Sequence, residues 1–448
     1  MEQLPDQVFE QRRARLMDSI GDDAVAVVVG PGMQHRSNDT DFRYRPSSDV
    51  LSLTGFREPE AVVLLAPGND DGEFVMFVPG RDPKHERWEG RRAGPEGAEE
   101  NYGADAAFAL DELDDEIGAW LEGRDKLFYT LGTDDQFDRR VIHWMQSERH
   151  RRSKPHSVPG QIVDLRDLLY EQRLIKSDAE LELMRHSAQI TVEAHNLAMK
   201  YCRPGMYEYE LQALIEYHFL RRGAEFPAYA SIVGAGDNAT ILHYTENRSR
   251  IEEGDVVLID AGCEYQYYAA DITRSFPAGG QFTPAQRDLY QAVLQAQKAA
   301  IDDVRPGMGY QQLRDNTRRR LSQSLLDLGL LEGTLDEVLE EKDFHDYYPH
   351  SVGHSLGVDV HDVGLVPDNE DDPCALREGM VLTIEPGLYV PADDESAPEE
   401  MRGVGIRIED DVLVTADGAE NLTVGCPKEP DAVEQLVGSA DPDQLPGA

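Results

Sequence analysis

Four acidic residues in the second half of the chain are embedded in apolar segments that are typical of buried β-strands. Asp260 ends the run VVLID, and Asp271 follows eleven positions later inside a second β-type run. Glu385 comes directly after four apolar or β-branched residues, and Glu409 lies inside the strand-like segment GIRIEDD. A buried carboxylate without a partner is very costly, so the fold must neutralise these side chains. On neighbouring strands, Asp260 and Asp271 could reach one pocket.

Histidines accompany these acids and indicate a metal site. The segment HSVGHSLGVDVHD carries His350, His354 and His361, while few basic residues lie near the four carboxylates. Carboxylates combined with imidazole suit Mn²⁺, Fe²⁺, Co²⁺ or Zn²⁺. Four carboxylates and one imidazole exceed what a single catalytic ion usually takes from a protein. They fit two ions that share bridging carboxylates.

Each member of this set has an ordinary structural explanation when it is taken alone. An Asp at the end of a strand is more often a cap or turn residue, and Glu409 could simply pair with Arg407. His350 and His354 are spaced as in a zincin helix, but that motif needs Glu directly after the first His, and here the segment reads HSVGH. The metal interpretation therefore depends on the whole ordered set.

The length of 448 residues favours two domains. In residues 1–172 the β-type runs AVAVVVG, AVVLLAPG, EFVMFVPG and KLFYTLG alternate with helical stretches, which predicts an α/β domain. We expect a second domain over 173–435 that mixes long helices and strands, followed by a flexible tail at 436–448. Ser177 and Glu180 form a capping-box pattern at the start of its first helix.

The charge of the chain excludes several function classes. A formal net charge of −43 argues against a nucleic-acid partner, because phosphate binding needs a basic surface. The sequence lacks an 18-residue apolar run, so we expect no membrane span. The segment MEQLPDQVFEQRRARL has no apolar core typical of a secretory signal, and the four Cys are scattered, so we expect a cytoplasmic protein. The acidity is interpreted as an adaptation to high intracellular salt, with an ordinary acidic cytosolic protein as the alternative.

The ordered acids and His354 resemble the pattern of the pita-bread metallopeptidases. The matching elements are Asp260, Asp271, GHSLG with His354, EPGLY with Glu385, and RIEDD with Glu409. In the first domain, NDTDFRYRPSSDVLSLTGFREPEAVVLL is similar to the N-terminal signature of the aminopeptidase P family. The resemblance implies an α/β N-terminal domain for oligomerisation and substrate access, plus an α+β pita-bread (creatinase/aminopeptidase fold) catalytic domain.

This resemblance also implies a reaction and its substrate. The family cleaves the first residue from peptides with proline in second position. It uses two divalent ions, most often Mn²⁺, and Co²⁺, Fe²⁺ or Zn²⁺ suit the same ligands. Hydroxide generated between the ions attacks the scissile carbonyl. The resemblance further implies a homodimer or homotetramer.

The roles implied for individual residues are as follows. Asp260 binds one ion, Asp271 and Glu409 bridge both, and His354 and Glu385 complete the second. Glu385 also transfers the proton, His243 and His361 contact the substrate carbonyl, and His350 lines the pocket near the proline ring. Arg407 and Tyr389 orient ligands or product, and Asp39 joins that network. In ERWEGRRAG, Trp88 corresponds to a residue that enters the active site of a neighbouring subunit in the bacterial enzyme.

Some positions depart from the family pattern, and three other functions compete with this one. Pro46 and Ser47 stand where relatives commonly have amide side chains, and Glu89 stands where an uncharged residue is frequent. Prolidase has a related fold and the same metals but cleaves only dipeptides. A creatinase-like hydrolase should lack the acidic ligands. A silent pita-bread module that binds protein or nucleic acid should have lost ligands or gained a basic extension.

Overall fold

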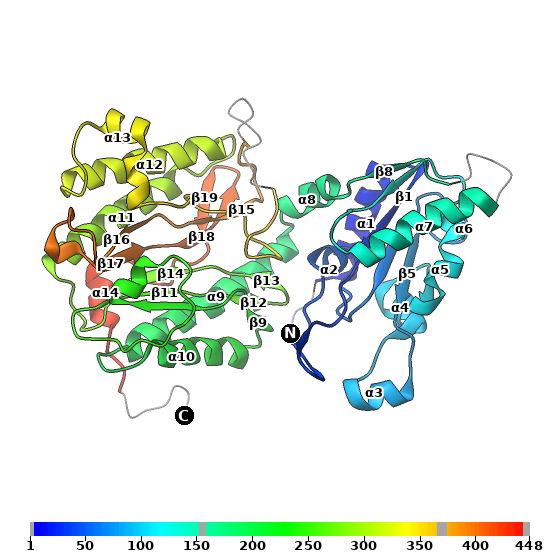
Figure 1. The fold of residues 1–448 in the computed structure, drawn as a ribbon, viewed down its shortest axis with the longest axis horizontal. Helices are drawn as coiled ribbons and strands as arrows, with labels where there is room; N and C mark the ends of the chain where they lie inside the picture. Colours follow the sequence, from blue (N-terminus) through cyan, green and yellow to red (C-terminus); the bar gives the residue numbers. More distant parts are fainter. Residues whose placement is uncertain (1–3, 152–157, 365–373, 442–448) are drawn as a thin grey trace. The chain divides into compact units, whose positions relative to one another are not determined.

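The computed structural model describes residues 4–151, 158–364 and 374–441, and the chain divides into two compact units, Met1–Arg173 and Leu174–Ala448 (Figure 1). Each unit has its own core. Within the described ranges, no helix is both long and apolar enough to cross a membrane.

Unit 1 is built on one mixed sheet with the strand order β6-β5-β4-β1-β7-β8. Its strands are β1 (Ala24–Val29), β4 (Val62–Leu65), β5 (Phe74–Val78), β6 (Ala106–Ala109), β7 (Lys126–Phe128) and β8 (Gln161–Val163), and a separate hairpin contains β2 (His35–Ser37) and β3 (Thr40–Asp41). The four β-type runs recognised in the sequence are strands β1, β4, β5 and β7, as predicted.

Helices cover both faces of this sheet. Successive residues of a strand point to opposite sides, so a continuous apolar run leaves both faces apolar and in need of cover. Ala26 of β1 packs in a cluster with Leu16, whereas its neighbour Val27 packs in another with Trp144. Strands buried on both faces read as continuous apolar runs, which explains the composition of these segments. The helices are α1 (Asp6–Ile20), α2 (Ser48–Thr54), α3 (Pro83–Glu89), α4 (Gly94–Tyr102), α5 (Leu113–Glu116), α6 (Gly118–Leu121), α7 (Asp135–Arg151) and α8 (Arg166–Leu174).

Unit 2 combines long helices with short antiparallel sheets, in the orders β10-β11-β14, β13-β12-β9, β15-β18-β19 and β16-β17. The strands are β9 (Phe226–Pro227), β10 (Ile232–Ala235), β11 (Val256–Asp260), β12 (Cys263–Tyr265), β13 (Tyr268–Ala269), β14 (Thr273–Pro277), β15 (Val381–Ile384), β16 (Gly387–Val390), β17 (Val404–Arg407), β18 (Asp410–Thr415) and β19 (Gly418–Asn421). The helices are α9 (Asp178–Tyr201), α10 (Glu208–Arg221), α11 (Pro284–Asp303), α12 (Tyr310–Asp327), α13 (Leu335–Glu341) and α14 (Pro430–Leu436). Figure 1 shows α9 and α10 on one side of the strands and α11, α12 and α13 on the other.

The first helix of unit 2 begins where the capping-box pattern predicts. Glu180 accepts hydrogen bonds from the Ser177 backbone N–H (2.8 Å) and hydroxyl (2.7 Å). The residues expected on the inner face of α9 are buried, namely Leu181, Met184, Ala188, Thr191, Ala194 and Ala198. At the other end of the unit, Gly438 of the expected tail donates its N–H to the carbonyl of Met199 at the end of α9 (3.1 Å).

Three predicted strands are broken, and each break falls at one of the acids. The segment MVLTIEPGLYV is divided at Glu385, because β15 ends at Ile384 and β16, in another sheet, begins at Gly387. Asp271 does not lie inside a strand, because the chain leaves β13 at Ala269 and enters β14 only at Thr273. Its backbone N–H donates to the carboxylate of Asp411 (3.2 Å) instead of to a neighbouring strand. Glu409 likewise lies between β17 and β18, which belong to different sheets. A continuous β-pattern in the sequence cannot reveal where a chain passes from one sheet to the next.

Gly262 marks a very close approach of two backbone segments between β11 and β12. A Cβ atom at this position would lie 1.7 Å from the carbonyl oxygen of Ala270 and 3.2 Å from the Cα of Asp271. Only glycine leaves room for this contact. The turn after Asp260 is thereby packed directly against the segment that carries Asp271.

Candidate active site

Strand pairing in unit 2 brings the acids together from distant parts of the sequence. Asp260 is the last residue of β11 and lies opposite Thr273 of β14. The Glu409 N–H donates to the Thr273 carbonyl (3.1 Å), and the Thr273 hydroxyl donates to the Glu409 carboxylate (2.7 Å). Thr273 therefore joins the segments that carry Asp260, Asp271 and Glu409, although nothing in the sequence pattern marks this residue.

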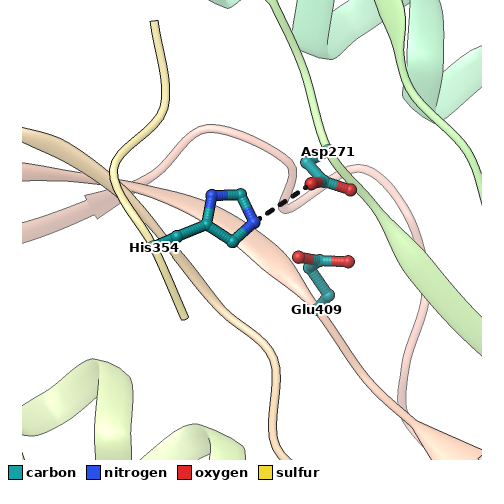
Figure 2. A group of neighbouring side chains, drawn as sticks. All are labelled: Asp271, His354 and Glu409. Atoms are coloured by element: carbon teal, nitrogen blue, oxygen red, sulfur yellow. Dashed lines mark ion pairs between the residues drawn. The ribbon is translucent and has the colours of Figure 1, made fainter. Parts of the chain in front are cut away.

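Asp271, His354 and Glu409 form the centre of the cluster (Figure 2). Each offers one ligand atom, and these atoms all lie within 4.8 Å of one another. His354 Nε2 lies 3.4 Å from Asp271 Oδ2 and 3.6 Å from Glu385 Oε1. The other ring nitrogen, Nδ1, is 3.0 Å from the carbonyl of Ser355. Donation from Nδ1 to this carbonyl fixes the tautomer that presents Nε2 as a ligand.

Asp260 is held by a tyrosine and an arginine at the edge of the cluster. Arg407 Nη2 donates to Asp260 Oδ2 (2.6 Å), and the Tyr229 hydroxyl lies 2.5 Å from Asp260 Oδ1. Tyr229 also contacts Asp271 Oδ1. Tyr229 is not recognisable from the sequence, because a lone tyrosine in EFPAYASIVG has neither spacing nor neighbours that distinguish it from a packing residue.

A line of hydrogen bonds extends from Asp260 towards the histidines. Arg407 Nη1 donates to the hydroxyl of Tyr389 (2.8 Å), which in turn lies 2.8 Å from Nε2 of His350. Each side chain in this line is fixed by its neighbours. Such groups orient ligands and substrate without themselves reacting.

The cluster opens into a cavity of about 430 Å³, a size suited to a small substrate. Nine of the predicted site residues line it, namely His243, Asp260, Asp271, His350, His354, His361, Glu385, Arg407 and Glu409. Apolar lining comes from Ala230, Ile232, Leu242 and Val360. The structure thus gathers catalytic-type groups and apolar surface in one place.

Of the other three predicted residues, Tyr389 lies behind the cavity lining, in hydrogen-bond contact with His350 and Arg407, whereas Asp39 and Trp88 belong to unit 1. Asp39 is exposed in the turn between β2 and β3. Trp88 lies in α3, which has no buried residue, and its side chain is 89 % exposed. Their roles stay predictions.

Burial and mutual repulsion shift the titration of the acids. Burial raises the pKa of Glu385 to about 7, although the charges of His354 and Arg407 oppose this shift. Burial, reinforced by the charges of Asp271 and Glu385, raises the pKa of Glu409 well above its usual range. Burial acts in the same direction on Asp271, but the hydrogen bond and charge of His354 outweigh it and lower the pKa of Asp271. The pocket therefore holds more acid than its own cations neutralise comfortably.

The donor set fits divalent cations. Carboxylate oxygens and one imidazole nitrogen converge within a few ångströms, and additional positive charge would oppose the burial and repulsion that raise the pKa of Glu409. Asp260 and Glu385 lie in the same pocket and supply further oxygens. This site suits hydrolysis at a metal centre, so the fold and the site together define a metal-dependent hydrolase.

Comparison with known proteins identifies the family. The model of metallopeptidase family M24 matches residues 182–416, and the model of the aminopeptidase P N-terminal domain matches residues 9–129. The chain therefore belongs to metallopeptidase family M24 and carries the N-terminal domain of aminopeptidase P.

Relatives and solved structures agree over almost the whole chain. The Xaa-Pro aminopeptidase of Escherichia coli is 40% identical over 441 residues, which cover 98% of this chain and 99% of that protein. The structure of Pseudomonas aeruginosa aminopeptidase PepP superimposes with a TM-score of 0.94 at 44% identity, covering 97% of this chain and 98% of the other. A variant of E. coli aminopeptidase P solved in complex with substrate gives a TM-score of 0.92 at 40% identity, with the same coverage. The α/β domain followed by a pita-bread domain is thereby confirmed.

Proposed function

We propose that this chain is an Xaa-Pro aminopeptidase, which removes the N-terminal residue from peptides with proline in second position. The observation that carries the proposal is the convergence of Asp271, His354 and Glu409 on one point, with their ligand atoms within 4.8 Å, in a cavity that also contains three further histidines. Similarity to Xaa-Pro aminopeptidases over 98% of the chain supports this choice of substrate.

In this proposal, five side chains hold two divalent ions, and Mn²⁺ is the proposed metal. They are Asp260, Asp271, His354, Glu385 and Glu409. When bound, the ions would polarise the scissile carbonyl and supply the nucleophile from water at neutral pH. Glu385, which borders the cavity, accepts and returns a proton at its carboxylate.

The remaining polar residues of the cavity bind and orient the peptide. His243 and His361 donate to the substrate carbonyl oxygen, where negative charge develops in the transition state. His350 lies beside the proline ring, and Tyr389 and Arg407 keep it and Asp260 in fixed positions. Proline lacks an N–H, so selectivity arises from the shape of the cavity more than from hydrogen bonds to that nitrogen.

The decisive experiment compares an Xaa-Pro-Pro tripeptide with an Xaa-Pro dipeptide in molar KCl. We expect the tripeptide to be cleaved preferentially, with activity lost on chelation and restored by Mn²⁺. Cleavage of the dipeptide alone would identify a prolidase, and cleavage of neither would contradict the proposal. Repeating the assay with Fe²⁺, Co²⁺ and Zn²⁺ ranks the metals, since ligand type alone permits all four.

We further propose a cytoplasm rich in salt as the environment of this enzyme. Its net charge of −43 creates strong self-repulsion. Salt reduces this repulsion, because the Debye length falls from about 10 Å at 0.1 M to about 3 Å at 1 M. The tripeptide assay should therefore give higher activity in molar KCl than at 0.1 M, and equal activity at both concentrations would contradict the proposed adaptation.

Unit 1 is proposed to build a homodimer or homotetramer and to control access to the site, with residues 1–172 in this role and 173–435 in catalysis. Asp39 joins the substrate network, and Trp88 enters the active site of a neighbouring subunit. Trp88 is 89 % exposed in the single chain, so its indole is accessible to a neighbouring subunit.

Replacing Trp88 by Ala should lower kcat/KM for the tripeptide by roughly tenfold, which corresponds to the loss of one aromatic contact. Circular dichroism should remain unchanged, because α3 buries no residue. Mixing Trp88→Ala subunits with inactive Asp271→Asn subunits tests the intersubunit role, since a hybrid would pair an intact site with an intact Trp88. Activity of the mixture should exceed the sum of its parts. A sum without gain, or a monomer in sedimentation, would contradict the role.

A further inference from the structure

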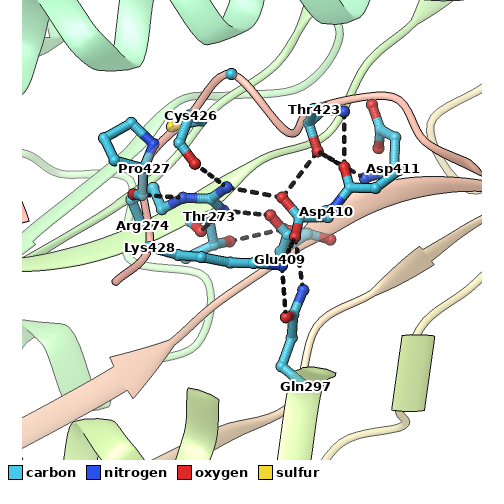
Figure 3. Close-up of polar contacts among 12 residues, drawn as sticks. Thr273, Arg274, Gln297, Glu409, Asp410, Asp411, Thr423, Cys426, Pro427 and Lys428 are labelled. Carbon is cyan, nitrogen blue, oxygen red and sulfur yellow. Dashed lines mark hydrogen bonds and ion pairs between the residues drawn. The ribbon is translucent and has the colours of Figure 1, made fainter. Parts of the chain in front are cut away.

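A network of buried charges adjoins the metal-ligand cluster, with Arg274 at its centre (Figure 3). Arg274 belongs to β14, and its side chain is completely buried. Its Nη2 pairs with Asp410 Oδ1 at 2.7 Å, and this carboxylate is also completely buried. Asp410 directly follows Glu409, whereas Arg274 comes three positions after Asp271. The network therefore adjoins two of the proposed ligands along the chain.

All five N–H donors of the Arg274 guanidinium have acceptors. Nη1 donates to the carbonyls of Glu409 (2.6 Å) and Thr273 (2.9 Å). Nη2 donates to Asp410 and to the carbonyl of Cys426 (2.8 Å), and Nε donates to the carbonyl of Pro427 (3.2 Å). An arginine presents five donors in one rigid plane, and a lysine has three on a flexible chain. This single side chain therefore ties together three segments that are distant in sequence.

Glu409 needs such a restraint because it lies at a break between two sheets. β17 ends at Arg407 and β18 begins at Asp410, so residue 409 lies outside both strands. Its N–H is held by Thr273, and its carbonyl is held by Arg274. Metal coordination requires ligand atoms placed within about 0.5 Å of their productive position. These two contacts, one on each side of the Glu409 Cα, fix the backbone position from which its carboxylate reaches the cluster.

Lys428 is a second cation in the same network with a different set of contacts. Its Nζ lies against Asp410 Oδ2 and donates to Gln297 Oε1 (2.8 Å). Gln297 also donates to Asp410 Oδ2 (2.8 Å), and the described contacts of Lys428 do not include Glu409. Lys428 thus neutralises Asp410 at Oδ2, whereas Arg274 binds Oδ1, and it offers a matched comparison for Arg274.

We propose that Arg274 is a positioning residue for the metal ligand Glu409, and that its planar fork, not its charge alone, sets the affinity of the site for metal. This inference rests on the proposed metal-dependent function. Arg274 is not among the residues that line the cavity, and its effect passes through the Glu409 carbonyl and the strand that follows Asp271.

The test compares Arg274→Lys with Lys428→Met, both measured on the full chain after chelation and titration with Mn²⁺ in a calorimeter. Arg274→Lys keeps the charge but loses the fork, and we expect its Kd for Mn²⁺ to rise about 10- to 100-fold. Its kcat should fall more than its KM changes, because Arg274 does not contact the peptide. Lys428→Met should lower Tm about as much as Arg274→Lys does, because each removes contacts of the same buried network. Its Kd for Mn²⁺ should stay within about twofold of wild type.

Two results would overturn the inference. Either Arg274→Lys binds Mn²⁺ as wild type does, or both variants lose affinity equally, which would make the network a general stabiliser. If Arg274→Lys does not fold, Asp410→Asn provides the measurement, since it removes the charge that anchors Arg274 and keeps the side-chain shape. A Kd at least several-fold higher is then expected, and an unchanged Kd contradicts the role. Wild-type protein that binds no Mn²⁺ would instead refute the proposed function itself.

Discussion

Asp271→Asn is expected to lower kcat/KM for an Xaa-Pro-Pro tripeptide by at least about 10³-fold, which corresponds to the loss of roughly 4 kcal/mol of transition-state stabilisation. Asn keeps the shape of the side chain but removes one negative charge and one ligand oxygen. Asp271 Oδ2 lies 3.4 Å from His354 Nε2 at the centre of the cluster, so the loss falls where the ligand atoms converge. Elemental analysis of bound metal should show at least one ion missing.

Asp288→Asn is the matched control, because it makes the same chemical change at an exposed position of α11. Activity and metal content of this variant should equal those of wild type. If Asp271→Asn retained full activity with two ions bound, the dinuclear assignment would be wrong. Circular dichroism distinguishes a loss of ligand from a loss of fold.

Gly262→Ala is expected to destabilise unit 2 severely, although it adds only one methyl group. The new Cβ would lie 1.7 Å from the carbonyl oxygen of Ala270 and 2.6 Å from its carbonyl carbon, which are backbone atoms that cannot rotate away. Inserting a methyl group into a packed site costs about 1–3 kcal/mol, and this backbone contact belongs at the upper end or above. The melting temperature of unit 2 should fall by at least about 6 °C.

Movement of the Ala270 segment also displaces Asp271, so metal affinity should fall together with stability. Gly418→Ala is the control, since no heavy atom lies within 4 Å of a Cβ at that position. Its stability should remain within about 0.5 kcal/mol of wild type. A wild-type melting temperature for Gly262→Ala would show that the two segments do not approach as closely as described.

The sequence was sufficient to predict the acids, the histidines and most strands, because burial leaves a strong local signal. An apolar run that ends in Asp or Glu is conspicuous, and Ser177, Glu180 and a regular apolar face predict the long helix α9. The apolar pattern is more continuous than the strands themselves, however. At Asp271 and Glu409 it predicted single strands where the chain passes between sheets, since strand-type runs precede and follow each break, as GIRI and VLVT do around Glu409.

Residues that act through long-range contacts could not be predicted. Tyr229 contacts Asp260 and Asp271, which lie 31 and 42 positions away, and Arg274 reaches carbonyls more than 130 positions away. A lone Tyr or a lone Arg carries no periodicity, and its partners are backbone atoms or residues that only the fold brings near. Such positions become visible only when the three-dimensional neighbours are known.

The placement of the acids at breaks between sheets links metal supply to the lifetime of the enzyme. Since the proposed ligands span positions 260 to 409, they assemble only when the strands of unit 2 have paired, and the unfolded chain offers no equivalent site. By mass action, free metal at 100 times its Kd would add about 2.7 kcal/mol to the stability of the folded state. In a cell starved of metal, the enzyme would be less active and also less stable. It would unfold more often and be degraded faster by the proteases of that cell.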